Sequence, residues 1–128
     1  MAGNADRCYD RNPSWRIFRM EWCDPYGWHR LGETEVERIR GLLVNLESRT
    51  WNEILVASNK QNHAVDIADL SKEARDRLVE LKLDDADKLV SLRLTARERV
   101  WGLFREGVMD LLWYDPMHQV CPSMMRNT

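Results

Sequence analysis

The chain has 128 residues and a mass of 15.2 kDa, which suits one domain with one hydrophobic core. Hydrophobic residues make up 44% of it and charged residues 31%, so the composition is that of a globular protein and excludes wholesale disorder. No stretch reaches the roughly 18 apolar residues of a membrane helix, and the first twenty residues lack the apolar block of a secretory signal. Three scattered cysteines, Cys8, Cys23 and Cys121, do not predict a disulfide framework, so we expect a cytoplasmic protein.

The net charge of −2 is unevenly distributed along the chain. Residues 88–128 carry six lysines and arginines against four acidic residues, and five of the six cations are arginine. Because the planar guanidinium group suits phosphate, this part of the chain indicates a surface for nucleic acid. The alternative is that these are solvated surface charges, as charge blocks usually are.

Residues 1–13 are polar and end in Asn-Pro, which predicts a flexible tail, and residues 14–128 are expected to form a single domain. The segment from Trp15 to Trp22 alternates in polarity and predicts a short strand. Asp24-Pro25-Tyr26-Gly27 follows as a turn.

Three helices are predicted after this turn. Thr34 and Glu37 have the spacing of a capping box, and Thr50 and Glu53 repeat it for a short second helix. Ser71 is expected to cap the third helix. The apolar stripe of the first helix consists of Val36, Ile39, Leu43 and Leu46. The inward face of the third helix consists of Ala74, Leu78 and Leu81.

The last forty residues are predicted to form strands. Residues 90–95 alternate between apolar and polar side chains, and residues 99–114 match a hairpin that turns at Glu106-Gly107. A helix over residues 99–114 is the alternative, but Gly102, Gly107 and the β-branched and aromatic residues favour strands. The expected fold class is therefore α+β: an N-terminal strand, two to three helices, then a C-terminal antiparallel sheet.

The strand interpretation brings several arginines onto one surface. Arg97, Arg99 and Trp101 would project from the same side of one strand, with Arg93 on the preceding strand. Guanidinium groups beside an indole suit single-stranded nucleic acid, because cations hold phosphates while the ring stacks on a base. The alternative is a buried Trp101 and a solvated row of arginines.

A second group of chemically active residues ends the predicted sheet. His118 lies close in sequence to Tyr114 and Asp115, and such groups can exchange protons near neutral pH. Pro116 would end the strand and leave His118 exposed. The alternative is an ordinary surface histidine in a turn, and His63 lies in a polar connection that could face the same groove.

The sequence gives little indication of a metal or cofactor. Cys23, His29, His118 and Cys121 could supply four ligands, but their spacing is not that of a zinc finger. No phosphate-binding glycine loop, HExxH motif or GxSxG motif is present. We therefore expect no metal site and no cofactor.

The stretch LVSLRLTARERVWGLFREGVMDLLWYDPMHQV, after a strand and helices, resembles the compact toxins of the RelE/ParE/HigB superfamily. It is also similar to small bacterial and phage proteins that end in a WWDPxH pattern. The resemblance implies a RelE-like fold and a metal-independent endoribonuclease of a toxin–antitoxin or phage-defence system. Such a protein cleaves RNA, often on the ribosome, and is held inactive by a cognate antitoxin.

The resemblance also implies roles for particular residues. His118 would transfer protons, assisted by Tyr114 and Asp115, in the attack of a ribose 2′-hydroxyl on the adjacent phosphate. Trp101 would stack on a base. The cations and further RNA contacts would be Arg93, Arg97, Arg99, Arg105 and His63.

An alternative function is a non-enzymatic interaction module, such as a phage inhibitor or a subunit of a defence system. Six tryptophans and six methionines in so short a chain leave apolar surface that a protein partner could cover.

Overall fold

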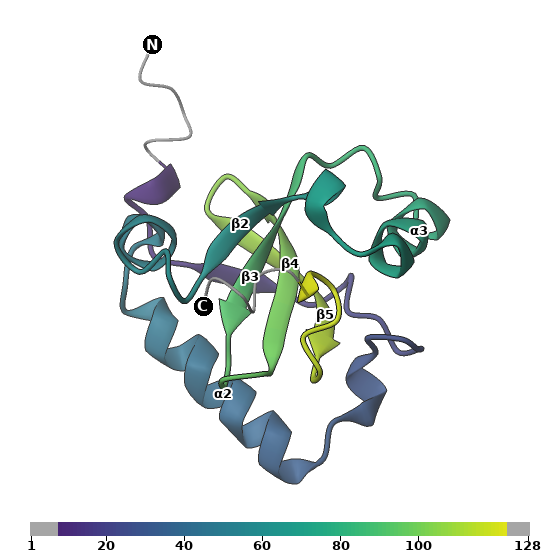
Figure 1. The fold of residues 1–128 in the computed structure, drawn as a ribbon. Helices are drawn as coiled ribbons and strands as arrows, with labels where there is room; N and C mark the ends of the chain where they lie inside the picture. The colour runs from purple at the N-terminus through teal and green to yellow at the C-terminus, as the bar shows by residue number, and fades with distance from the viewer. Residues whose placement is uncertain (1–7, 123–128) are drawn as a thin grey trace.

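A five-stranded mixed sheet forms the centre of the protein in a computed structural model that describes residues 8–122 (Figure 1). The strands are β1 (Ser14–Arg16), β2 (His63–Asp66), β3 (Lys88–Arg93), β4 (Arg99–Arg105) and β5 (Val108–Asp115). Their order is β1-β5-β4-β3-β2, with β1 parallel to β5 and every other pair antiparallel. The predicted α+β class, with an N-terminal strand before helices and C-terminal antiparallel strands, is confirmed.

Helices pack on both faces of this sheet (Figure 1). They are α2 (Glu33–Glu47), α3 (Lys72–Glu80), the short 3₁₀ turns η1 (Trp28–Arg30) and η3 (Ile67–Asp69), and the π-helical turn η2 (Glu53–Ala57). We call the two sides of the sheet the α2 face, which η2 also covers, and the α3 face. None of the helices formed by residues 8–122 has the length and apolar character needed to cross a membrane.

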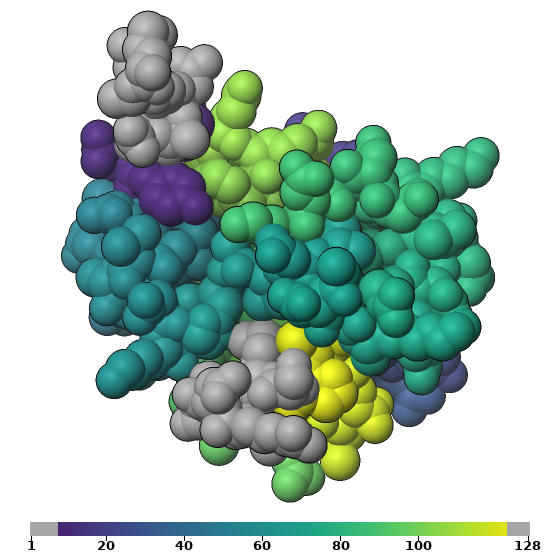
Figure 2. Space-filling model, turned by 45° about the horizontal axis from the view of Figure 1, so that its top comes forward, coloured from purple at the N-terminus to yellow at the C-terminus, as the bar shows by residue number. Residues whose placement is uncertain are grey.

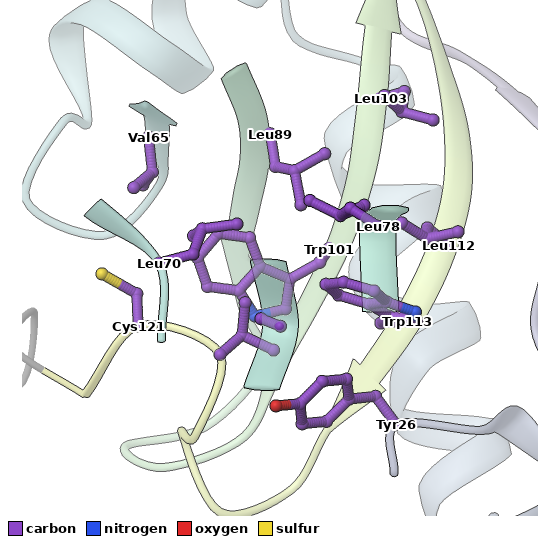
Figure 3. Packing of buried hydrophobic residues seen from close by; sticks show 12 residues of the cluster. Tyr26, Val65, Leu70, Leu78, Leu89, Trp101, Leu103, Leu112, Trp113 and Cys121 are labelled. Carbon is purple, nitrogen blue, oxygen red and sulfur yellow. The ribbon is translucent and has the colours of Figure 1, made fainter. Parts of the chain in front are cut away.

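The apolar core is divided between the two faces. Side chains alternate along each strand, so neighbouring residues of β4 contribute to opposite layers. The layer on the α3 face includes Leu78, Leu89, Trp101, Leu103 and Trp113 (Figure 3). The layer on the α2 face includes Ile39, Leu46, Ile54, Leu92 and Val100.

Two of the three predicted helix caps are confirmed. The Ser71 Oγ accepts a hydrogen bond from the Ala74 amide at 3.2 Å, and the Thr50 Oγ1 accepts one from the Glu53 amide at 3.2 Å. The first helix begins earlier than predicted, because the Gly32 amide donates to the Glu35 carboxylate at 2.8 Å. The Thr34–Glu37 box was wrong because a second carboxylate with the same three-residue spacing lies two positions upstream.

The β4–β5 hairpin turns where the sequence predicted. Glu106 and Gly107 both have positive φ, 51° and 86°, as a two-residue type I′ turn requires. The helical alternative for residues 99–114 is therefore wrong. A β-bulge after Trp101 shifts the register, so that Trp101 pairs with Trp113 and Gly102 pairs with Leu111.

The N-terminal segment departs from prediction in two ways. Strand β1 ends at Arg16, and the chain then turns, with the Met20 amide bonded to the Ile17 carbonyl at 3.1 Å. Residues 8–13 are not a loose tail, since Cys8 is buried and the Trp51 amide donates to the Arg11 carbonyl at 3.0 Å. Tertiary packing on η2 and the hairpin holds a segment whose local sequence is only polar. The rest of the predicted tail, 1–7, and the last part of the predicted domain, 123–128, lie outside the described residues.

Candidate functional site

Six polar residues meet on the α3 face at one edge of the sheet. Strand β2 begins there, β3 ends there, β4 begins there and β5 ends there. In the cross-strand register, His63 pairs with Ser91, and Arg99 pairs with both Arg93 and Asp115. Since neighbouring strands lie about 4.8 Å apart, these five side chains are close together. His118 joins them from the turn after β5, where the charges of Arg99 and Asp115 act on its imidazole. We call the group the polar cluster: His63, Ser91, Arg93, Arg99, Asp115 and His118.

The polar cluster holds buried polar atoms that lack hydrogen-bond partners. Within residues 8–122 these atoms are His63 Nε2, Ser91 Oγ, Arg99 Nε, and both ring nitrogens of His118, and all five belong to the cluster. A buried polar atom without a partner costs about 1–3 kcal/mol, and proteins rarely leave several together. Such a concentration marks a site arranged for something other than stability.

Arg99 is the charged centre of the polar cluster. Its side chain is 1% exposed, and its Nη1 donates to the carbonyls of Thr95 at 2.7 Å and Glu98 at 2.9 Å. These two bonds fix the guanidinium group against the β3–β4 loop. Burial and the neighbouring Arg93 lower the pKa of Arg99, but a guanidinium group in a protein keeps its charge. With Arg93 it gives the cluster two positive charges against the single carboxylate of Asp115.

Asp115 shapes the turn that carries His118. Its carboxylate accepts the amides of Gln119 at 2.8 Å and Val120 at 3.0 Å, and the indole N–H of Trp101 at 3.3 Å. The turn places His118 at φ 57°, a left-handed conformation that few non-glycine residues adopt. Asp115, expected to assist His118 in proton transfer, therefore holds the backbone around His118 and makes no hydrogen bond to its imidazole ring.

Arg99 acts electrostatically on both imidazole rings. Burial, and next the positive charge of Arg99, lower the pKa of both His63 and His118. Charge on His118 lowers the pKa of His63 further. Because the ordinary value is 6.5 and both shifts are downward, both rings are neutral at pH 7. A neutral imidazole has one N–H donor and one acceptor nitrogen. In His63 only Nε2 lacks a partner, whereas in His118 both ring nitrogens do.

Two aromatic residues proposed from the sequence do not join the polar cluster. Trp101 is fully buried in the core, close to Leu70 and Leu89, so no face of its indole is open to a base (Figure 3). Tyr114 lies on the α2 face, where its hydroxyl donates to the Glu98 carboxylate. Burial and Glu98 both raise the pKa of Tyr114, which opposes a proton-transfer role. A strand places consecutive residues on opposite faces, and this separates Tyr114 from Asp115.

Two of the proposed arginines also lie apart from the polar cluster. Arg97 is exposed in the loop that joins β3 and β4, where the chain has left the sheet. Arg105 lies at the opposite end of β4 and pairs with Asp110 at 3.0 Å. Arg93 faces the same side as Arg99, as the strand interpretation predicted. His63 was expected in a polar connection but begins strand β2, which the sequence did not predict. His118, expected to be exposed beyond Pro116, is instead 1% exposed.

Ser91 belongs to the site but was not proposed as a site residue. Its side chain is fully buried between the neighbouring strands, and its hydroxyl lacks a partner among residues 8–122. The available signal was its position two residues before Arg93, which places both on one face of β3. Small hydroxyl residues are common on strands, so this signal alone does not distinguish it.

The structure does not gather the residues weighed as zinc ligands. Cys23 contacts Glu21 and Arg77, whereas the Cys121 thiol donates to the Asp69 carbonyl at 3.3 Å. Across residues 8–122, no three or more His, Cys, Asp or Glu side chains are grouped to hold a metal ion.

Comparison with known proteins gives no match to a protein-family model, to a curated protein or to a solved structure. The resemblance to the RelE/ParE/HigB toxins therefore stays a prediction. The polar cluster itself is then the basis for assigning a function.

Proposed function

We propose that this protein is a metal-independent endoribonuclease whose active site is the polar cluster. The observation that carries the proposal is the group of five unpartnered buried atoms on His63, Ser91, Arg99 and His118. Two imidazoles, a hydroxyl and a guanidinium group supply what cleavage of a phosphodiester beside a 2′-hydroxyl requires: a base, an acid and a cation. The toxin-like pattern of the C-terminal stretch points to the same substrate.

The chemistry assigns the imidazoles to proton transfer. One neutral imidazole takes the proton of the ribose 2′-hydroxyl while that oxygen bonds to phosphorus. The bond from phosphorus to the 5′-oxygen breaks, and the second imidazole, in its protonated form, donates a proton to the leaving oxygen. The products are a 2′,3′-cyclic phosphate and a free 5′-hydroxyl. Arg99 Nε, which has no partner in the described chain, stabilises the charge that builds up on the phosphoryl oxygens.

Substrate binding also supplies the protonated imidazole. Without a ligand, Arg99 and burial lower the pKa of both histidines. A phosphate anion in the polar cluster acts in the opposite direction, because a nearby negative charge favours the charged imidazole. Only RNA-bound protein would then hold one histidine in the acidic form.

Access to the polar cluster requires the turn after β5 to move. His118 is 1% exposed, and the segment after β5, yellow in Figure 2, lies against the teal region that contains β2 and α3. The Asp115 carboxylate accepts two backbone amides of this turn and fixes its closed form. Opening would release these bonds and expose the rings of His63 and His118 together.

The test is cleavage of labelled RNA, free and on translating ribosomes, by the purified protein in EDTA. We expect His63→Asn and His118→Asn each to reduce the cleavage rate by about 10²–10⁴-fold, the usual contribution of one acid or base. His29→Asn is the matched control, because His29 is partly exposed beside Asp24 and lies outside the polar cluster. Circular dichroism establishes that the variants are folded. Intact RNA in every wild-type reaction would contradict the proposal.

A second function has its own supporting observation. Exposed apolar residues, among them Ile17, Trp22, Val36 and Val44, border a groove of about 650 Å³ between the segment after β1 and helix α2. Apolar surface of this kind is typical of a protein-binding site, which fits a non-enzymatic interaction module. Under this alternative, copurification with the product of the adjacent reading frame would fall with Val36→Glu and be unaffected by His118→Asn.

A further inference from the structure

Four arginines gather around the β4–β5 turn, at the end of β4 opposite the polar cluster. We call Arg11, Arg16, Arg19 and Arg105 the arginine patch. Three of them line a hollow of about 590 Å³ together with Glu106, Val108 and Asp110. The Arg11 guanidinium donates to the Glu106 carbonyl at 3.4 Å, which ties the start of the described chain to the turn. Figure 2 shows the same adjacency, with the purple segment beside the light green hairpin.

The arginine patch carries more positive charge than its own structure neutralises. The Asp110 carboxylate is buried and forms ion pairs with two guanidinium groups, those of Arg19 at 3.3 Å and Arg105 at 3.0 Å. The side chains of Arg19 and Arg105 nevertheless remain 32% and 61% exposed. Arg11 and Arg16 are exposed and have no ion pair within residues 8–122. Two guanidinium groups are therefore available to an anion from solution.

An exposed aromatic ring orients two of these arginines. The guanidinium carbons of Arg16 and Arg19 lie over the ring of Phe18, 4.7 Å and 4.6 Å from its centre. Phe18 is 57% exposed, so this assembly is on the surface and contributes little to the core. Stacking on a ring restricts the motion of a guanidinium group, and an oriented guanidinium group loses less entropy when it binds phosphate.

The arginine patch and the polar cluster share one face of the sheet. Every second side chain of β4 projects to the α3 face, and these are the side chains of residues 99, 101, 103 and 105. Arg99 is at one end of this row and Arg105 at the other. Arg16 pairs with Asp110, and Asp110 with Leu103, which places Arg16 on the same side. Six residues of strand separate Arg99 from Arg105 by about 20 Å, since each residue advances about 3.3 Å. The core residues Trp101 and Leu103 lie buried between these two ends, so an RNA that contacts both ends passes around the core.

We propose that the arginine patch binds the phosphate backbone of single-stranded RNA, outside the cleavage site. The inference rests on the proposed function for the identity of the polymer. It adds a second RNA contact, of which the sequence indicated only Arg105. Arginine rather than lysine at all four positions, together with the exposed ring, favours nucleic acid, because guanidinium planes and aromatic rings both stack on bases.

The experiment measures binding without cleavage. The probe is a fluorescein-labelled 2′-O-methyl oligouridine of twelve nucleotides, which lacks the hydroxyl that attacks phosphorus, and the readout is fluorescence anisotropy against salt. We expect the double variant Arg11→Glu and Arg16→Glu to raise Kd about tenfold or more and to flatten the salt dependence by roughly 0.7 per phosphate lost. This variant leaves the two arginines that pair with Asp110 in place, so the fold is retained.

The double variant Arg40→Glu and Arg49→Glu is the matched control, because it makes the same charge change at two exposed positions on α2 and just after it. If the patch and control variants bind the probe as the wild type does, the inference is wrong. It is also wrong if the wild-type protein does not bind the probe but binds polyglutamate through Arg11 and Arg16. That result would identify an acidic protein as the partner. If binding depends on the arginine patch but RNA is not cleaved, only the proposed function is contradicted. If RNA is cleaved but binding does not depend on the arginine patch, only this inference is contradicted.

Discussion

At the scale of single residues, Ser91 shows how the polar cluster departs from ordinary packing. The serine is fully buried between strands, next to residues of the apolar core, and its hydroxyl has no partner in residues 8–122. An alanine would fill nearly the same space without the desolvated oxygen. The Ser91 hydroxyl is therefore free to bond to a molecule that enters the polar cluster.

Ser91→Ala is expected to raise the free energy of unfolding by about 1 kcal/mol, because it removes an unsatisfied buried hydroxyl. The comparison is Ser71→Ala, which removes the α3 cap bonded to the Ala74 amide and should lower the free energy of unfolding by about 1 kcal/mol. Urea unfolding of both variants at pH 7 measures the two changes. A loss of stability in Ser91→Ala equal to that in Ser71→Ala would show that the Ser91 hydroxyl is hydrogen-bonded after all.

At the scale of elements, the β4–β5 hairpin is the most strongly specified part of the fold. The type I′ turn needs two residues with positive φ, and only the second, Gly107, adopts that conformation without strain. A Cβ on Gly107 would also lie 3.3 Å from the Arg11 side chain. The turn sets the register of the whole hairpin. At the other end of β4, six residues from Arg105, this register places Arg99 beside Asp115.

Gly107→Ala should therefore destabilise the protein by about 1–2 kcal/mol, the cost of a left-handed conformation for an L-residue. Glu106→Asn should stabilise the protein by between a few tenths of a kcal/mol and about 1 kcal/mol, because asparagine tolerates positive φ better than glutamate. Thermal unfolding followed by circular dichroism gives both values. Equal melting temperatures for the two variants would mean that the turn does not limit stability.

At the scale of the whole molecule, Glu21 joins three parts of the chain. Its buried carboxylate pairs with Arg77 of α3 and accepts the indole N–H of Trp113 of β5 at 2.7 Å. Its own amide donates to the Leu112 carbonyl at 3.1 Å. Burial acts to raise the pKa of Glu21, but the hydrogen bonds from Arg77 and Trp113 outweigh it and hold the pKa below 4.5. The ion pair fixes the N-terminal segment and α3 to the sheet.

Arg77→Ala should lower the free energy of unfolding by about 3 kcal/mol at pH 7, since it leaves a buried carboxylate without its cation. The depressed pKa of Glu21 contributes stability that is complete above 4.5 and is lost as pH falls through the lower folded-state value. The difference between wild type and variant should therefore shrink below pH 4. Lys72→Ala, which breaks the exposed pair with Asp76, is the control and should change stability by less than about 1 kcal/mol. Chemical unfolding across pH 3–7 measures both; a difference independent of pH would contradict this account.

Local signals in the sequence determined several features correctly. The caps at Ser71 and Thr50, the strand alternation around Leu92 and the turn at Glu106-Gly107 each depend on residues within about four positions of one another. Such interactions form wherever the segment lies in the fold. The strand alternation also predicted correctly that Arg93 and Arg99 face the same side.

The meeting of the two histidines was decided by tertiary structure. His63 and His118 are 55 positions apart in the chain and come together only because β2 and the turn after β5 border the same edge of the sheet. Adjacent residues were separated for the same reason, since Tyr114 and Asp115 face opposite layers. Period and spacing report which side of an element a residue occupies. Which elements then face one another depends on the packing of the whole core, and no local pattern records it.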